Sequence, residues 1–179
     1  MGRSIALFGT SADPPTIGHK KILEELSKIY AFTISYVSNN PKKKHIEDIS
    51  IRSHLLKTLI EDLDNPKILF NQSVSSQWAV ESIKKCKEIY KFNDLDFVIR
   101  SDLIKDIFCW KNFDKIILEV SFFIMLREGY PVEANTLTML ETYKVKFKIS
   151  TIKIPDTFNH INIYFSNRNL NNNCVSILP

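Results

Sequence analysis

The strongest chemical signal in the sequence is a loop near the N-terminus that combines glycines, hydroxyl groups and a histidine. It reads Gly9-Thr-Ser-Ala-Asp-Pro-Pro-Thr-Ile-Gly-His19 and follows an apolar run, residues 3–8, that is typical of a buried strand. A strand, a glycine turn and a helix start bring unpaired backbone N–H groups together with the positive end of the helix, which favours a bound phosphate. Gly18 allows close approach of backbone and ligand, and Thr16 can cap the helix or offer its hydroxyl to the same anion. The alternative is an ordinary loop with a capping threonine and a surface histidine, and the spacing Thr-x-Gly-His directly after a strand favours the phosphate site.

The rest of the chain alternates between strand-like and helix-like segments. Helical periodicity covers residues 17–30, 51–63, 76–90, 112–119 and 132–143, and strand-like runs cover residues 3–8, 31–37, 67–70, 96–99, 120–126 and 145–154. This alternation predicts an α/β fold, a Rossmann-like doubly wound parallel sheet with helices on both faces. Because such sheets bind ligands beyond the carboxyl ends of their strands, we expect the chemistry just after Phe8, Val37, Ile99 and Leu126.

The second predicted helix follows a polar, lysine-rich loop at residues 39–48. Ser50 is a plausible N-cap, and the apolar spacing predicts a buried face formed by Ile51, Leu55, Leu59 and Leu63.

Composition sets the broad class. The 179 residues are 44% hydrophobic and 25% charged, which fits one globular domain, predicted at residues 1–156, followed by an Asn-rich, weakly ordered tail at 157–179. The longest apolar runs are too short to span a membrane, and no secretory signal is found, so we expect a cytoplasmic protein. The three cysteines are widely spaced, which argues against both a disulfide framework and a zinc site. A net charge of +4 is compatible with phosphate-bearing partners but does not imply nucleic-acid binding.

Several motifs resemble one enzyme family. Thr16-Ile17-Gly18-His19 matches the (H/T)-x-G-H signature of the nucleotidyltransferase superfamily, and the longer loop looks most like bacterial nicotinate-mononucleotide adenylyltransferases, particularly the cyanobacterial branch. The resemblance continues in Asn40-Pro-Lys-Lys43-Lys-His45, in Arg52 near the start of the second helix, in Ser101-Asp102-Leu-Ile with Trp110 downstream, and in Arg127-Glu-Gly129-Tyr130.

The resemblance implies adenylyl transfer from ATP to nicotinate mononucleotide, giving deamido-NAD and pyrophosphate. His19 and Thr16 would hold the ATP phosphates at the loop formed by Gly9 and Gly18, helped by the backbone N–H groups of Thr10 and Ser11. Lys43 and Arg52 would contact phosphate, Asp102 a ribose hydroxyl, and Trp110 the pyridine ring. Mg²⁺ would be bound through ATP phosphates and water, so no protein metal ligands are expected. A homo-oligomer is compatible with the sequence.

Each downstream residue also has a structural interpretation. The lysines at 42–44 can form a solvated loop, Arg52 a surface charge, Asp102 a helix cap, and Trp110 a lid on the core.

The match to the family breaks at three places. Arg100 stands where the family has glycine, Ala79 where it usually presents threonine, and residues 155–162 where it has Ser-Ser-Thr-x-x-Arg. Two alternatives therefore stay open: a catalytically weakened nucleotide-binding relative, and a pantetheine-phosphate adenylyltransferase. The latter shares the Thr-x-Gly-His loop, but Asp102, Trp110 and the Arg-x-Gly-Tyr turn speak against it.

Overall fold

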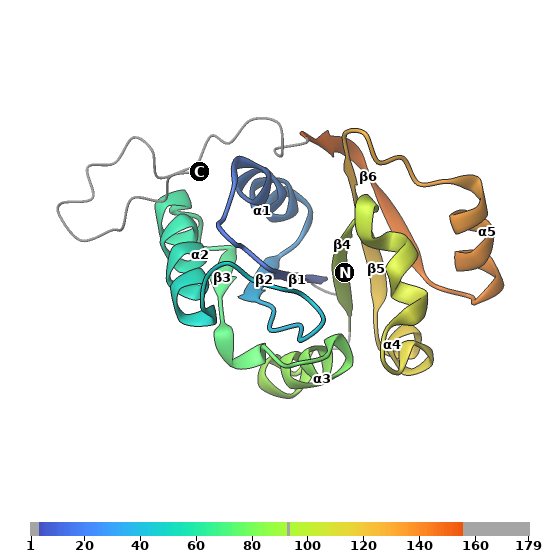
Figure 1. Cartoon of the computed structure of the whole chain (residues 1–179), viewed down its shortest axis with the longest axis horizontal. Coiled ribbons are helices and arrows are strands. Elements are labelled where there is room, and N and C mark those ends of the chain that lie inside the picture. Colours follow the sequence, from blue (N-terminus) through green and yellow to red (C-terminus); the bar gives the residue numbers. More distant parts are fainter. Residues whose placement is uncertain (1–3, 93, 156–179) are drawn as a thin grey trace.

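The computed structural model describes residues 4–92 and 94–155, and these form a single parallel sheet flanked by helices (Figure 1). The strand order is β3-β2-β1-β4-β5-β6, and every neighbouring pair is parallel. The strands are β1 (Ile5–Thr10), β2 (Phe32–Val37), β3 (Ile68–Phe70), β4 (Leu95–Arg100), β5 (Ser121–Arg127) and β6 (Phe147–Ile154). This order, with its reversal between β1 and β4, confirms the predicted Rossmann-like, doubly wound topology.

The helices cover both faces of the sheet, as predicted. They are α1 (Ile17–Ile29), α2 (Ile49–Leu63), α3 (Ala79–Tyr90), α4 (Phe113–Glu119) and α5 (Ala134–Thr142), with 3₁₀ helices η1 (Gln72–Val74) and η2 (Ser101–Cys109). Helices α1 and α2 pack on one face, whereas α3, η2, α4 and α5 pack on the other. None of the helices within the described residues is long and apolar enough to cross a membrane.

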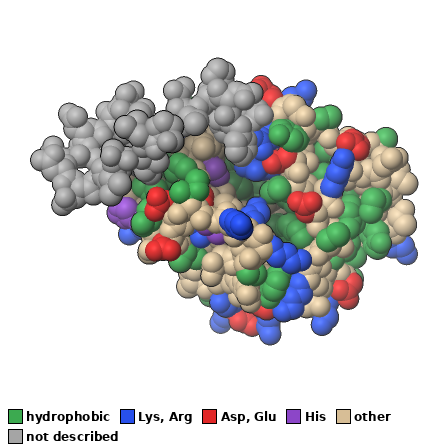
Figure 2. All heavy atoms as spheres, in the orientation of Figure 1, with side chains coloured by type: hydrophobic (Ala, Val, Ile, Leu, Met, Phe, Trp, Pro, Cys, Tyr) green, Lys and Arg blue, Asp and Glu red, His purple; other side chains and the backbone are tan. Residues whose placement is uncertain are grey.

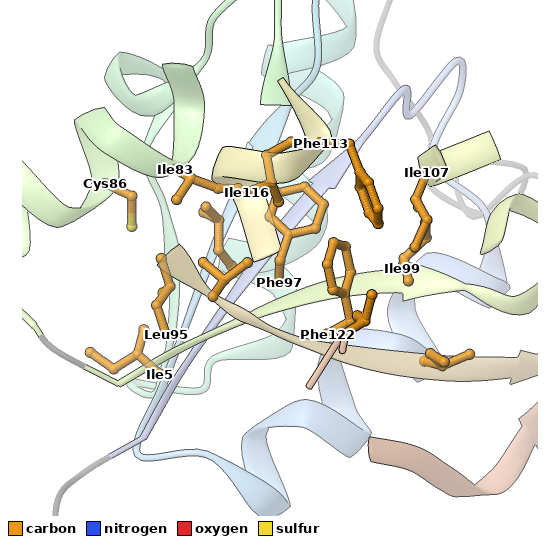
Figure 3. Close-up of a cluster of buried hydrophobic side chains, with 14 of the residues drawn as sticks. Ile5, Ile83, Cys86, Leu95, Phe97, Ile99, Ile107, Phe113, Ile116 and Phe122 are labelled. Atoms are coloured by element: carbon orange, nitrogen blue, oxygen red, sulfur yellow. The ribbon is translucent and has the colours of Figure 1, made fainter. Parts of the chain in front are cut away.

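The core consists of two apolar clusters separated by the sheet. In β1, Ile5 and Leu7 belong to one cluster, while Ala6 and Phe8 belong to the other. This alternation follows from the two-residue period of a strand, because a central parallel strand must be apolar on both faces. Figure 3 shows the larger cluster, in which residues of α3, η2 and α4 meet the strands.

Two sequence predictions need correction here. Helix α2 begins at Ile49 with Asp48 as N-cap, not at Ser50, and its buried residues are Arg52, Leu56, Leu59 and Ile60. The predicted face was correct at Leu59, which is buried, and at Leu63, which packs against the core. It was wrong at Ile51, which is 46% exposed, because the buried Arg52 occupies the inner stripe. The predicted tail, residues 157–179, lies outside the described residues.

Candidate active site at the carboxyl edge of the sheet

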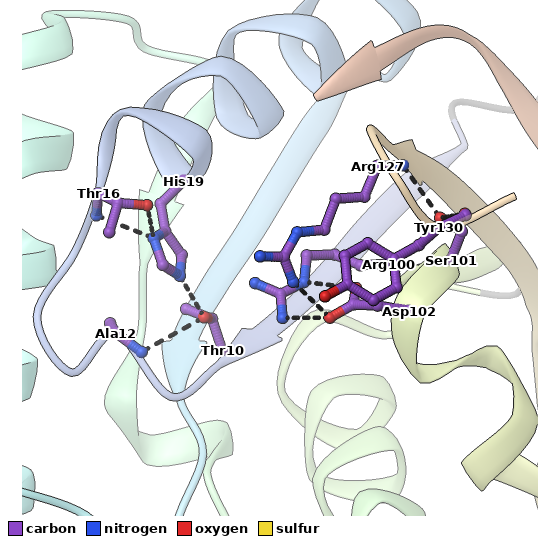
Figure 4. A network of polar contacts seen from close by, with 9 residues as sticks. All are labelled: Thr10, Ala12, Thr16, His19, Arg100, Ser101, Asp102, Arg127 and Tyr130. Atoms are coloured by element: carbon purple, nitrogen blue, oxygen red, sulfur yellow. Dashed lines mark hydrogen bonds and ion pairs between the residues drawn. The ribbon is translucent and has the colours of Figure 1, made fainter. Parts of the chain in front are cut away.

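Strands β1, β4 and β5 end in Thr10, Arg100 and Arg127, and these three side chains border one site (Figure 4). They occupy the positions at which the sequence predicted chemistry, one or two residues beyond Phe8, Ile99 and Leu126. In Figure 2, Lys and Arg side chains gather around a hollow near the middle of the face in view. The site lies at the strand reversal between β1 and β4, where open α/β sheets bind their ligands.

His19 is fixed on both of its ring nitrogens. It lies in the first turn of α1 and is only 8% exposed. Its Nδ1 accepts the backbone N–H of Thr16 at 2.9 Å, and its Nε2 lies 2.8 Å from Oγ1 of Thr10. Because Nδ1 accepts a hydrogen bond, the proton of the neutral ring must be on Nε2, which therefore donates to Thr10. The ring presents an N–H donor toward the end of β1.

The surroundings keep His19 uncharged. Burial lowers its pKa from 6.5 to about 3, and the positive charges of Arg100 and Arg127 act in the same direction. At neutral pH the imidazole is therefore a hydrogen-bond donor, while the positive charge of the site comes from the guanidinium groups.

Gly9 is required by a close approach of two strands. It pairs with Tyr36 of β2, and a Cβ atom on Gly9 would lie 2.6 Å from Cζ and from the hydroxyl oxygen of Tyr36. Any side chain here would displace the tyrosine ring. Gly18 is also buried, in the first turn of α1.

Across the site, two arginines share one carboxylate. Arg100 donates to Asp102 through Nε to Oδ1 at 3.0 Å and through Nη2 to Oδ2 at 2.9 Å. Arg127 donates to the same Oδ2 through Nη1 at 2.7 Å. In Figure 4 both guanidinium groups extend toward Thr10 and His19. The pairing with Arg127 and Arg100 is the main role that the structure shows for Asp102, whose predicted ribose contact stays a prediction.

Ser101 and Tyr130 hold the side of the site formed by Arg100, Asp102 and Arg127, the cationic wall, in place. The Ser101 hydroxyl donates to the carbonyl of Tyr130 at 2.6 Å and accepts the backbone N–H of Arg127 at 3.0 Å. The guanidinium carbon of Arg127 lies 4.8 Å from the centre of the Tyr130 ring, which is a cation–π distance. The sequence prediction assigned no role to Ser101 or Arg127, although Arg127 lies at a predicted strand end and within a quoted motif.

Arg52 is a buried residue whose side chain connects three loop segments by hydrogen bonds. Its side chain donates through Nη1 to the carbonyls of Ser11 at 2.8 Å and Ser38 at 3.3 Å, and through Nε to the carbonyl of Glu47 at 3.0 Å. The residue is 2% exposed, so the surface-charge interpretation is wrong. Its predicted phosphate contact is not tested by these bonds. What they show is that Arg52 joins the segments that follow β1 and β2 to the start of α2.

Lys43 belongs to the exposed loop at residues 39–47 but lies within electrostatic range of Arg100 and Asp102. Loss of water around its ammonium group lowers the pKa of Lys43, the charge of Arg100 lowers it further, and Asp102 opposes the shift. The far end of the loop is held by Asp13, whose carboxylate accepts the backbone N–H groups of Ile46 at 2.7 Å and of Glu47 at 3.1 Å.

Trp110 lies at the end of η2 and is half-buried. Its ring packs edge-on against Phe97 at 5.7 Å and at a tilt against Phe122 at 6.4 Å between centroids. These contacts support the core-closing interpretation, and stacking on a pyridine ring stays a prediction.

The donor set suits an anion better than a metal ion. Arg100, Arg127 and Lys43 lie around the carboxylate of Asp102, both of whose oxygens already accept from guanidinium groups. Among the described residues, no group of three or more His, Cys, Asp or Glu side chains could hold a metal ion.

Comparison with known proteins identifies the family. The cytidylyltransferase-like family model matches residues 7–156, which include every site residue named above. The chain belongs to the cytidylyltransferase-like family of nucleotidyltransferases. This cytidylyltransferase-like chain is 30% identical over 146 residues to a probable nicotinate-nucleotide adenylyltransferase from Synechocystis sp., with 76% of this chain and 73% of the relative covered. The predicted resemblance is thereby confirmed.

Two further proteins are similar to this cytidylyltransferase-like chain. A phosphopantetheine adenylyltransferase from Latilactobacillus sakei is 33% identical over 104 residues, covering 53% of this chain and 63% of the relative. The structure of Plasmodium falciparum nicotinic acid mononucleotide adenylyltransferase complexed with NaAD superposes with a TM-score of 0.71 at 23% identity, over 86% of this chain and 76% of that chain. At this identity the superposition shows the fold.

Proposed function

We propose that the protein transfers the adenylyl group of MgATP to nicotinate mononucleotide, forming deamido-NAD and pyrophosphate. In this reaction a phosphate oxygen of the mononucleotide attacks the α-phosphorus of ATP, and the bond to the bridging oxygen breaks as pyrophosphate leaves. The observation that carries the proposal is the pairing of a buried, neutral His19 with Thr10 opposite the cationic wall of Arg100 and Arg127. The relative from Synechocystis sp. supports the choice of acceptor.

Catalysis of this kind needs positioning and charge stabilisation, because the substrates react directly with each other. The N–H of His19 Nε2 would leave the Thr10 hydroxyl and donate to a phosphate oxygen of ATP. Thr16 keeps that N–H on Nε2 by donating its own backbone N–H to Nδ1. Arg127 and Lys43 would balance the negative charge that shifts to the leaving pyrophosphate.

Mg²⁺ enters as part of the ATP substrate, held by phosphate oxygens and water. Its charge would help to neutralise the leaving group. The site residues described above would bind the remaining phosphate oxygens through donors, which is what guanidinium, ammonium and imidazole N–H groups provide. We also infer that residues 1–156 form the nucleotidyltransferase domain and that the enzyme works in the cytoplasm.

Pyrophosphate release tests the proposal. The wild-type protein is given MgATP with nicotinate mononucleotide, nicotinamide mononucleotide or phosphopantetheine in separate reactions. We expect turnover with the nicotinate compound and a loss of about 10²–10³-fold in kcat for His19→Ala, the scale for removing one donor to a developing charge. His54→Ala is the matched control, because His54 is an exposed residue of α2.

Turnover with phosphopantetheine alone would replace the proposal with the pantetheine reaction. No turnover with any acceptor, in folded protein that binds ATP, would identify a nucleotide-binding relative that has lost the reaction.

A further inference from the structure

Arg100 brings a positive charge to the carboxyl edge of the sheet, beside the site. It is the last residue of β4. Strand β4 lies next to β1 in the sheet, and the last residue of β1 is Thr10. The family that the sequence resembles has glycine at this position, so the resemblance assigns no role to this side chain. Its guanidinium group nevertheless lies within electrostatic range of both His19 and Lys43.

Positive groups crowd the carboxylate of Asp102. Its Oδ2 accepts from Arg100 Nη2 at 2.9 Å and from Arg127 Nη1 at 2.7 Å, so two guanidinium groups are held within a few ångströms of each other. The ammonium group of Lys43 lies within electrostatic range of the same pair of residues, Arg100 and Asp102. An anion that binds Arg100 would relieve the repulsion between these like charges, and two oxygens of a phosphate group match the two donors of a guanidinium fork.

The two arginines differ in how firmly they are held. The Arg127 side chain is 5% exposed and also packs against the ring of Tyr130, while its backbone N–H is bonded to Ser101. The Arg100 side chain is 27% exposed. If one of them exchanges its partner, it is Arg100, because its guanidinium group has the greater access to solvent and to a ligand.

The exchange would also change what Asp102 offers. Arg100 Nε is the donor on Oδ1, whereas Oδ2 also accepts from Arg127. Departure of Arg100 therefore uncovers Oδ1 while Arg127 holds the carboxylate in place through Oδ2. A carboxylate oxygen so exposed accepts a hydrogen bond from a hydroxyl group.

We propose that Arg100 is a phosphate-binding residue of this site, which leaves Asp102 for the phosphates of ATP and so uncovers Asp102 Oδ1 for a ribose hydroxyl. The proposal rests on the proposed function in that it takes ATP as the ligand. It assigns a phosphate contact to Arg100, a residue at which the sequence departs from the family pattern that it resembles.

Equilibrium binding of ATP, adenosine and pyrophosphate tests the proposal without requiring turnover. Calorimetry measures the affinities for ATP and pyrophosphate, and an NMR titration measures the affinity for adenosine, which binds more weakly. We expect Arg100→Gly to weaken the binding of ATP and of pyrophosphate about tenfold or more, as for loss of a charge-assisted contact, and not to weaken the binding of adenosine, because Asp102 Oδ1 is then free for its ribose. Arg100→Lys should weaken the binding of ATP less than Arg100→Gly does, because lysine keeps the positive charge and loses only the forked pair of guanidinium donors.

Asp102→Asn separates phosphate binding from a merely structural role. If Arg100 binds phosphate, Asp102→Asn removes its competitor, so pyrophosphate binds several-fold more tightly, and Arg100→Gly still weakens ATP when it is added to the Asp102→Asn variant. If Arg100 serves only to position Asp102, the effect of Arg100→Gly disappears in that variant. That disappearance, or an ATP-to-adenosine affinity ratio unchanged within about twofold in Arg100→Gly, would overturn the proposal.

Controls keep the two proposals distinguishable. Lys84→Ala removes one positive charge from an exposed position on α3, and it should leave all three affinities unchanged. Circular dichroism and thermal melting establish that each variant is folded. If wild-type protein shows no adenylyl transfer but Arg100→Gly weakens the binding of ATP, the proposed function fails and the role of Arg100 stands.

Discussion

Acid should destabilise this protein through His19. The imidazole has a pKa of about 3 in the folded protein and 6.5 when unfolded. Between these values the unfolded chain binds a proton that the folded chain does not, so the free energy of unfolding falls by about 1.4 kcal/mol per pH unit. The stability contributed by the neutral ring is complete above pH 6.5 and is lost as the pH falls toward 3. From pH 7 to pH 5 the expected loss is about 2 kcal/mol.

Urea unfolding at pH 7 and pH 5 measures this loss in wild-type protein and in His19→Asn. Asparagine does not titrate, and its side-chain oxygen can accept the N–H of Thr16 that Nδ1 accepts now, which preserves the start of α1. The wild-type protein should lose about 2 kcal/mol more than the variant between the two pH values. With a urea slope of about 2 kcal/mol/M, the midpoint shifts differ by about 1 M. His54→Ala is the control, since it should keep the wild-type pH dependence.

Two results would refute this reasoning. One is an equal loss of stability in wild-type protein and His19→Asn. The other is an NMR titration in which the His19 ring gains its proton near pH 6.5, or in which the neutral ring carries its proton on Nδ1. Either would mean that the ring is not a buried neutral donor, and the role given to its Nε2 N–H would fail with it.

Three further substitutions test other parts of the site. Gly9→Ala should cost about 1–3 kcal/mol of stability, because its Cβ would overlap the Tyr36 ring, and Tyr36→Leu in the same chain should recover part of it in a double-mutant cycle. Arg52→Met should lower the free energy of unfolding by about 2–4 kcal/mol, since it leaves three carbonyls without their donor, and equal urea midpoints for variant and wild type would contradict this. Lys43→Ala should raise KM for ATP about tenfold at unchanged thermal stability, whereas Lys57→Ala, an exposed lysine of α2, should leave KM unchanged; parallel changes in both variants would count against a role for Lys43.

The sequence predicted the sheet and the strand ends because both depend on local patterns. Each strand is a short apolar run, and a parallel sheet places successive strand ends at one edge. The motif from Thr16 to His19 follows the first strand directly, so it indicated where that strand ends. The pairing of Asp102 with Arg127 was not predictable in this way, because the two residues come from different elements 25 positions apart and meet only through the packing of η2 on β5.

Helix α2 shows how a buried charge hides a helical face. Its inner stripe is Arg52, Leu56, Leu59 and Ile60, at helical spacing. Apolar periodicity does not include an arginine, so it favours Ile51 and Leu55, each one position before the buried Arg52 and Leu56. The signal that could have found the inner stripe is the arginine itself, at the start of the helix in line with two leucines.

The 3₁₀ helix η2 also escaped prediction. Its buried residues, Ser101, Ile104 and Ile107, recur every three positions, which matches the three residues per turn of a 3₁₀ helix. Templates for α-helix and strand, with periods near 3.6 and 2, do not detect this spacing. A template of period three applied after each strand end would have placed Ser101 on the inner face, where it bonds Arg127.

Arg52 and Asp13 together fix both ends of the loop at residues 39–47. Arg52 holds the carbonyls of Ser38 and Glu47 on either side of it, and Asp13 holds the backbone N–H groups of Ile46 and Glu47. We therefore expect motion of the residues around Lys43 to stay between these two fixed ends and not to reach the loop at residues 9–19. We also expect that residues of this span other than Lys43 can be replaced by design while the loop after β1, the sheet edge and helix α2 keep their positions.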